Sequence, residues 1–291
     1  MEMRNESSNR KSKTSRLWLW LGGALVVCAF VAIVLFRGRV ERVDEGREER
    51  VERVEFGEYK GFDNLELGVP GKADKIVNRF GYALGFSRFF HQPLWVAYRL
   101  TAGEANPRTK ESRREFYQDP DIPGSANPRD YARSGYDRGH LAPAADMAFT
   151  NIAMIESFSM ANISPQEPAF NRDVWLRLEN AVRDIATREG SIFIVTGPVF
   201  ADGAKDAKYI ANGKIRVPEY FYKVILDETP PEKTIAFIIA NKGHKGSLEA
   251  FAVTVDDVEE ATGLDFFSGL PDEKEEALER TCNYKDWRIT R

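Results

Sequence analysis

The sequence predicts an α+β domain with a central, mainly antiparallel sheet and flanking helices, preceded by one transmembrane helix. Strand-like apolar runs dominate residues 57–291, and an uncharged apolar run precedes them at residues 17–36. With 43% hydrophobic residues the chain can bury a core. Its formal net charge of −4 excludes a uniformly basic surface, so nucleic-acid binding would have to come from locally placed Lys and Arg.

The N-terminal region predicts a membrane anchor. A polar tail, residues 1–16, precedes the apolar run from Leu17 to Phe36, which as a helix would span roughly 30 Å, the thickness of one hydrocarbon core. The alternative is a cleaved signal peptide, whose apolar core is usually shorter and ends in a small-x-small site. Because no such site precedes Arg37, we expect an uncleaved single-pass anchor.

Residues 37–56 predict a charged stalk or linker between the anchor and the domain. The run from Arg39 to Val43 recurs from Arg50 to Val54 and would place valines along one helical face. A solvated linker is one interpretation, and weak self-association into a homodimer is the other. We expect no disulfide between the two cysteines.

Periodicity predicts the elements of residues 57–291. Residues 108–132 are rich in Pro, Asp and Arg and indicate a loop. Residues 171–185 carry an apolar stripe at helical spacing, and Asn212-Gly213 indicates a hairpin turn. Four apolar runs predict strands: 93–100, 191–198, 220–225 and 234–240.

Three histidines are the candidates for imidazole chemistry. We expect His91 to cap a strand and His244 to lie in an exposed turn. His140 differs, because Asp137-Arg138-Gly139-His140 places a potential base beside a cation that can bind phosphate. Gly139 would let the backbone approach a bulky substrate. On spacing alone, an ordinary surface histidine remains the alternative.

Residues 136–143, Tyr-Asp-Arg-Gly-His-Leu-Ala-Pro, resemble the signature of the DNA/RNA non-specific endonucleases, the ββα-metal family. A second block is similar as well, at Ala161 to Gln166, Phe170-Asn171, Trp175 and Leu178-Glu179. Further similarity extends the resemblance over about residues 60–275. It implies a ββα-metal nuclease domain, and an endonuclease that hydrolyses DNA and RNA with little sequence specificity.

The resemblance also implies roles for individual residues. His140 would be the general base, and Asn171 the protein ligand of a divalent ion, expected to be Mg²⁺ with Mn²⁺ or another divalent ion as the alternative. Glu179 would orient metal-bound water or protonate through it. Substrate phosphate would be bound by Arg138, which also counts among the catalytic residues, and by Arg114. Asn162 would lie beside the site and fix substrate or a neighbouring side chain.

Each role has a structural alternative. Asn171 could be a helix N-cap, since Asn is favoured there. Glu179 alone would be a solvated helix charge, and Arg113 could contact phosphate in place of Arg114. Asp137 is expected to hold the loop as a structural partner.

Two other functions stay open: a membrane-tethered protein that captures nucleic acid without cutting it, and a hydrolase of a different phosphodiester. Basic residues are nearly balanced across the run at residues 17–36, so charge does not decide its orientation. A non-specific nuclease in the cytoplasm would attack its own cell's nucleic acids. We therefore expect the catalytic domain to be extracytoplasmic, periplasmic or extracellular.

Overall fold

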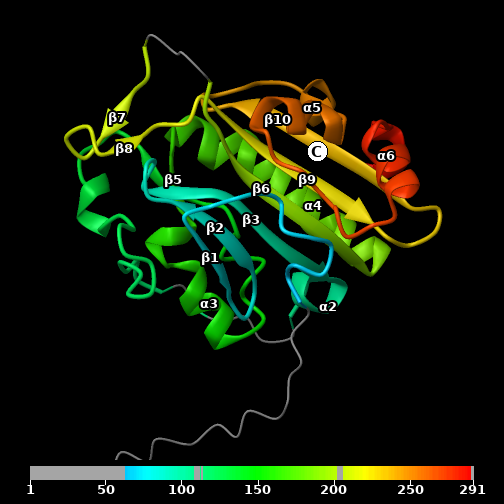
Figure 1. Cartoon of the computed structure of the whole chain (residues 1–291), viewed down its shortest axis with the longest axis horizontal. Helices are drawn as coiled ribbons and strands as arrows, with labels where there is room; N and C mark the ends of the chain where they lie inside the picture. Colours follow the sequence, from blue (N-terminus) through cyan, green and yellow to red (C-terminus); the bar gives the residue numbers. More distant parts are fainter. Residues whose placement is uncertain (1–62, 108–111, 113, 202–205, 290–291) are drawn as a thin grey trace, which may run out of the picture. The chain divides into compact units, whose positions relative to one another are not determined.

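A seven-stranded antiparallel sheet organises the part of the chain that this computed structural model describes, residues 63–107, 112, 114–201 and 206–289 (Figure 1). The strand order is β1-β2-β3-β6-β9-β10-β11. The strand bounds are β1 Lys75–Asn78, β2 Ala83–Ser87, β3 Gln92–Thr101, β6 Ser191–Val199, β9 Tyr220–Asp227, β10 Lys233–Ala240 and β11 Ala252–Val253.

Successive side chains of a strand point to opposite sides of the sheet. A hydrophobic cluster buries each of these two faces. In β3, Tyr98 joins one hydrophobic cluster and Trp95 joins the other. The first cluster includes the inner face of helix α4, Leu176–Glu189, and the second includes Val258 of α5 and Leu278 of α6. The sheet therefore lies between α4 on one face and α5 and α6 on the other.

The remaining helices are short. The α-helices are α2 Ala102–Ala105, α3 Asn151–Ser157, α5 Val255–Thr262 and α6 Asp272–Glu279. The 3₁₀ turns are η1 Pro128–Tyr131, η2 Met160–Asn162, η4 Leu248–Phe251 and η5 Tyr284–Trp287. A π-helical segment, η3 Phe170–Trp175, leads directly into α4.

Two small sheets stand apart from the large one. The first pairs β4, Asp137–His140, with β5, Ile163–Gln166, in antiparallel register. Because η3 and α4 follow β5 closely along the chain, these segments form a ββα unit on which the candidate site is built. The second pairs β7, Tyr209–Ile210, with β8, Ile215–Arg216.

The predicted α+β class and antiparallel sheet are confirmed, and each of the four predicted strands is present as β3, β6, β9 or β10. The turn at Asn212-Gly213 joins β7 to β8, and both residues have positive φ angles of 57° and 87°. The predicted helix at 171–185 differs at its start, where η3 replaces the first α-helical turns. The predicted loop at 108–132 contains η1 among its described residues.

The predicted tail, anchor and stalk, residues 1–56, lie outside the described residues. Within the described ranges, no helix is both long and apolar enough to cross a membrane. Cys28 also lies outside them, and Cys282 is an exposed free thiol.

Candidate active site

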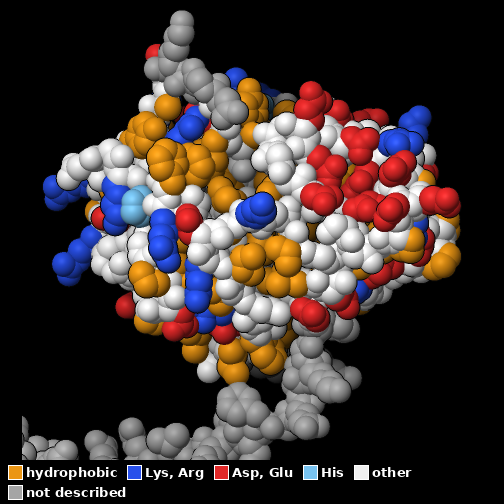
Figure 2. Space-filling model, in the orientation of Figure 1, with side chains coloured by type: hydrophobic (Ala, Val, Ile, Leu, Met, Phe, Trp, Pro, Cys, Tyr) orange, Lys and Arg blue, Asp and Glu red, His pale blue; other side chains and the backbone are white. Residues whose placement is uncertain are grey.

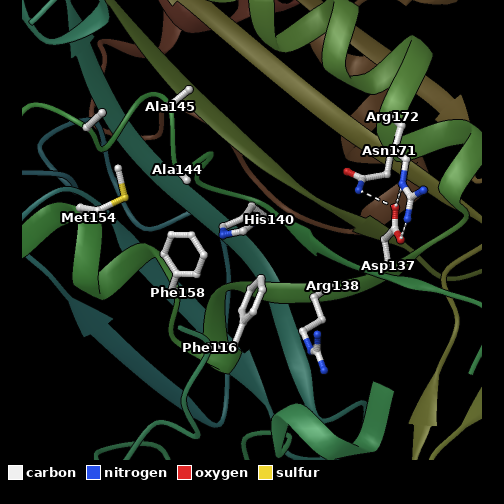
Figure 3. Close-up of a pocket in the computed structure, with 11 residues that line it drawn as sticks. Phe116, Asp137, Arg138, His140, Ala144, Ala145, Met154, Phe158, Asn171 and Arg172 are labelled. Atoms are coloured by element: carbon white, nitrogen blue, oxygen red, sulfur yellow. Dashed lines mark hydrogen bonds and ion pairs between the residues drawn. The ribbon is translucent and has the colours of Figure 1, made fainter. Parts of the chain in front are cut away.

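A cavity of about 760 Å³ opens beside the ββα unit (Figure 3). His140 and Asn171, which are far apart in the sequence, line the same cavity. The loop after β4, helix α3, Phe158 and Phe116 form its other walls. The full lining is Phe116, Asp137, Arg138, His140, Ala144, Ala145, Ala148, Met154, Phe158, Asn171 and Arg172.

His140 ends strand β4 and stands opposite Ile163 of β5. Two aromatic rings flank its half-buried imidazole: Phe158 lies 4.9 Å away, edge to face, and Phe116 lies 5.3 Å away, with both distances measured between ring centroids. Phe158 is itself buried, so it gives the imidazole a fixed wall. These contacts restrict the ring to the orientation that lines the cavity.

Asn171 lies in the first turn of η3, with its amide nitrogen donating to Asp137 Oδ2 at 3.0 Å. The alternative of an N-cap is wrong, because Ala169 occupies that position and makes no side-chain capping bond. Figure 3 shows the amide oxygen turned away from Asp137. No hydrogen bond from a described residue reaches this oxygen, which leaves it available as a ligand.

Asp137 connects both sides of the ββα unit. Its carboxylate accepts from Asn171 and also from Arg172, whose Nε and Nη2 donate at 2.8 and 2.6 Å. Burial disfavours the ionised carboxylate, but the bonds from Arg172 and Asn171 outweigh it and hold the pKa of Asp137 below its usual value. Asp137 thus has the structural role expected of it, with a pairing to Arg172 that was not predicted.

Gly139 has a different role from the one predicted. A Cβ atom at this position would lie 2.2 Å from the Gln166 side chain. The bare face of Gly139 is therefore occupied by Gln166 of the paired strand, and not by substrate.

The two predicted phosphate-binding arginines differ in position. Arg138 lines the cavity, but its Nε and Nη2 donate to the carbonyl oxygen of Pro128 at 3.2 and 2.6 Å. Its guanidinium also lies 5.3 Å from the centre of the Phe116 ring. Arg114 is outside the lining and donates to Ser112 and Asn151. Arg113 lies outside the described residues.

Asn162 is fully buried and does not line the cavity. Its amide oxygen accepts from the Ala142 nitrogen, and its amide nitrogen donates to the Ala142 and Ser157 carbonyl oxygens, each at 2.9 Å. This geometry corrects the expectation of substrate contact: Asn162 instead fixes the loop that follows His140.

Glu179 lies on α4, outside the cavity lining, in a cluster of charged side chains with Lys223, Asp146 and Arg183. Burial raises the pKa of Glu179 to about 7, with the positive charge of Lys223 opposing the rise. Lys223 is fully buried on β9, and its Nζ lies 5.0 Å from the centre of the Trp175 ring. The charges of Asp146 and Arg183 also shift the pKa values of Glu179 and Lys223. Arg183 Nη1 donates to Asp146 Oδ1 at 2.6 Å.

Sequence reasoning missed Arg172, Phe158 and Lys223. Arg172 follows Asn171 directly, but its partner Asp137 comes from another part of the chain. Lys223 interrupts the apolar run 220–225, and a lone lysine in a strand usually marks an exposed position. Its burial depends on α4 covering that face of the sheet.

Comparisons with known proteins agree with the architecture. The sequence profile of the DNA/RNA non-specific endonucleases matches residues 60–273. Nuclease C1 of Cunninghamella echinulata is 35% identical over 71% of this chain and 88% of its own. Nuclease 1, mitochondrial, of Schizosaccharomyces pombe is 38% identical over 71% and 70%. A crystal structure of an EndoG/EndoGI complex matches with a TM-score of 0.65 and 31% identity, over 72% of this chain and 91% of that one.

Proposed function

Because the chain belongs to the DNA/RNA non-specific endonuclease family and is a nuclease, we propose that it cuts DNA and RNA phosphodiesters at the cavity between His140 and Asn171. The observation that carries this proposal is that both side chains line one cavity. Contacts to phosphate and sugar hold no base information, so little sequence specificity is expected.

His140 is the proposed general base. An imidazole can accept a proton from water near neutral pH, and the flanking rings of Phe116 and Phe158 fix its direction. The water would attack the scissile phosphorus from the His140 side of the cavity. Arg138 and Arg114 are the proposed phosphate contacts, because guanidinium groups match phosphate oxygens.

Asn171 is the proposed protein ligand of a divalent ion, on which nucleases of this family generally depend. Its amide oxygen fits this role because the nitrogen is held by Asp137 and the oxygen is turned away from that bond. Oxygen ligands suit Mg²⁺, the proposed ion, and Mn²⁺ is the alternative. When bound, such an ion supplies positive charge that stabilises the phosphate and the leaving oxygen. Glu179 is the residue proposed to orient water bound to that ion.

The test is cleavage of supercoiled plasmid and of RNA by the full-length protein with Mg²⁺. We expect His140→Ala to slow cleavage about 10²- to 10⁴-fold while the protein remains folded, since the residue acts in proton transfer. His244→Ala is the matched control, because this histidine bonds to the Ala240 carbonyl oxygen and does not line the cavity.

Cleavage by His140→Ala at the parent rate would remove the base assignment. If the parent cuts neither nucleic acid but hydrolyses bis(p-nitrophenyl) phosphate, a different phosphodiester is the substrate.

For residues 17–36 we propose a single-pass membrane anchor that leaves the nuclease domain extracytoplasmic. The support is the length and lack of charge of this run in the sequence.

A further inference from the structure

Acidic side chains gather over α5 and α6, on the face of the sheet opposite α4 (Figure 2). The cluster, named here the α5–α6 acidic cluster, consists of Asp256, Glu259 and Glu279. One carboxylate oxygen from each residue lies within 4.8 Å of the other two. Two helices that meet over the sheet thus direct three carboxylates at one point.

Glu279 has the least solvent contact of the three, with 6% of its surface exposed. Its Oε1 atom is buried and has no hydrogen-bond partner. An ionised carboxylate in this position is unfavourable unless a cation or a proton compensates its charge. The buried oxygen is an observation independent of the clustering, and it indicates that a partner belongs here.

The described residues supply no cation to the cluster. Among the described residues, no Lys or Arg forms an ion pair with the cluster. Lys274 of α6 and Arg280, which follows α6, form ion pairs with other residues: Lys274 with Glu232 at 2.8 Å, and Arg280 with Glu276 at 2.7 Å. Burial and the surrounding carboxylates, Glu259 and Glu275 foremost, raise the pKa of Glu279 to about 8. No described basic side chain therefore balances the charge of the three carboxylates.

We propose that the α5–α6 acidic cluster binds one Ca²⁺ ion, separate from the cavity of the ββα unit. Ca²⁺ accepts six to eight oxygen ligands at about 2.3–2.6 Å, so ligands on opposite sides lie roughly 5 Å apart. The 4.8 Å limit on the oxygen separations fits that range. Mg²⁺ needs near-octahedral geometry at shorter distances and keeps its water, which suits this irregular set of carboxylates less well.

Binding would tie α6 to α5. Leu278, next to Glu279, and Val258, next to Glu259, both cover the same sheet face. An ion held between the two helices therefore stabilises the packing of the C-terminal segment on the sheet. Its effect is on stability, and not on the chemistry of the cavity.

The experiment is thermal unfolding of the full-length protein in mild detergent, after removal of metal with EDTA and dialysis. With CaCl₂ at about 100 times the dissociation constant, the melting temperature should rise by roughly 5 °C or more. The same concentration of MgCl₂ should give a smaller rise. Equilibrium dialysis with radioactive calcium should show one ion bound in Asn171→Ala, in which the proposed catalytic site has lost its ligand.

In the Asn171→Ala background, in which the proposed catalytic site has lost its ligand, Glu279→Gln should abolish the calcium response. Without calcium it should melt above its Asn171→Ala parent because a buried carboxylate is gone. Glu276→Gln is the matched control, since this residue of α6 pairs with Arg280 and lies outside the cluster. It should keep the response. An unresponsive parent, or a calcium response retained in Glu279→Gln, would overturn the proposal. An unresponsive parent together with a stabilised Glu279→Gln would show that the cluster holds a proton instead.

Discussion

The carboxylate of Asp137 sets the direction of the Asn171 amide. Because Asp137 is acceptor-only when ionised, it can bond only to the nitrogen of that amide, which leaves the oxygen for the proposed metal ion. Its lowered pKa keeps it ionised over the whole neutral range. Asp137 thereby determines which atom Asn171 presents to the cavity.

Asp137→Ala should release this amide. We expect the Mg²⁺ concentration for half-maximal cleavage to rise roughly 10- to 100-fold, the usual effect of losing a group that orients a metal ligand. A Mg²⁺ titration of plasmid nicking measures it. Arg172→Ala is the control, because Arg172 also bonds to Asp137 but leaves the Asn171 bond in place. Equal midpoints for Asp137→Ala and the parent would contradict the orienting role.

Lys223 should set the pH at which Glu179 ionises. Glu179 is faced by Lys223 from β9, Arg183 from α4, and Asp146 and Tyr98 from neighbouring segments. The positive charge of Lys223 lowers the pKa of Glu179, so Lys223→Met should raise that pKa further above its present value of about 7. If the carboxylate is the working form, the rising limb of the pH–rate profile moves to higher pH by roughly one unit.

Cleavage rates between pH 5 and 9.5 measure this shift. Lys233→Met is the matched control, since Lys233 also lies over an indole ring, that of Trp287, at 5.1 Å. Its profile should stay in place. If the rising limb of the pH–rate profile of Lys223→Met stays in place or moves to lower pH, Lys223 does not set the pH at which Glu179 ionises.

At the scale of elements, the pairing of β4 with β5 holds the site together. Gly139 and Gln166 pack against each other across this pair, with no room for a Cβ atom on the glycine. The pair is only four residues long on each side, so one steric conflict affects its whole length. His140 is the next residue after Gly139 and would move with it.

Gly139→Ala should destabilise the protein by about 1–3 kcal/mol, the usual cost of overpacking, and should lower the cleavage rate. Urea unfolding and plasmid nicking measure the two effects. Gly103→Ala is the control, because Gly103 lies in a helix and a Cβ atom added there would meet only the Thr101 hydroxyl, at 4.0 Å. The double variant with Gln166→Ala should recover stability. Without such recovery, the conflict with Gln166 is not the cause.

The sequence predicts the long central strands well and the short elements poorly. Strands such as β6 are buried on both faces, so their apolar runs are long and continuous. The edge strand β1 is short and mostly exposed, and β11 has only two residues, so neither leaves a clear pattern. The sequence motifs point to His140 and Asn171. The π-helical geometry of η3 could not be predicted, because its apolar residues have the spacing of an ordinary helix.

At the scale of the whole molecule, charge is unevenly distributed. Figure 2 shows acidic side chains over α5 and α6, and Lys and Arg side chains on the other side of the same face. A net charge of −4 therefore hides a basic region. A polyanion would approach through that region, and screening by salt should weaken the attraction.

The proposed anchor gives a prediction at this scale. Full-length protein expressed with its own N-terminus should remain in the membrane fraction after a carbonate wash, and deletion of residues 17–36 should release it. Protease added to intact cells or right-side-out vesicles should digest residues 57–291 only if they lie outside. Full-length protein found in the soluble fraction would contradict the anchor, and protection from protease would reverse the orientation.

The π-helical segment η3 makes the active site sensitive to chain length as well as to residue type. A π turn holds more residues than an α turn, and each residue of a helix is rotated by about 100° from the last. Deleting a single residue between Asn171 and Trp175 would relax η3 into ordinary helix and swing the amide around the axis, away from Asp137. Every residue of the motif could then be intact while the proposed metal ligand faced solvent.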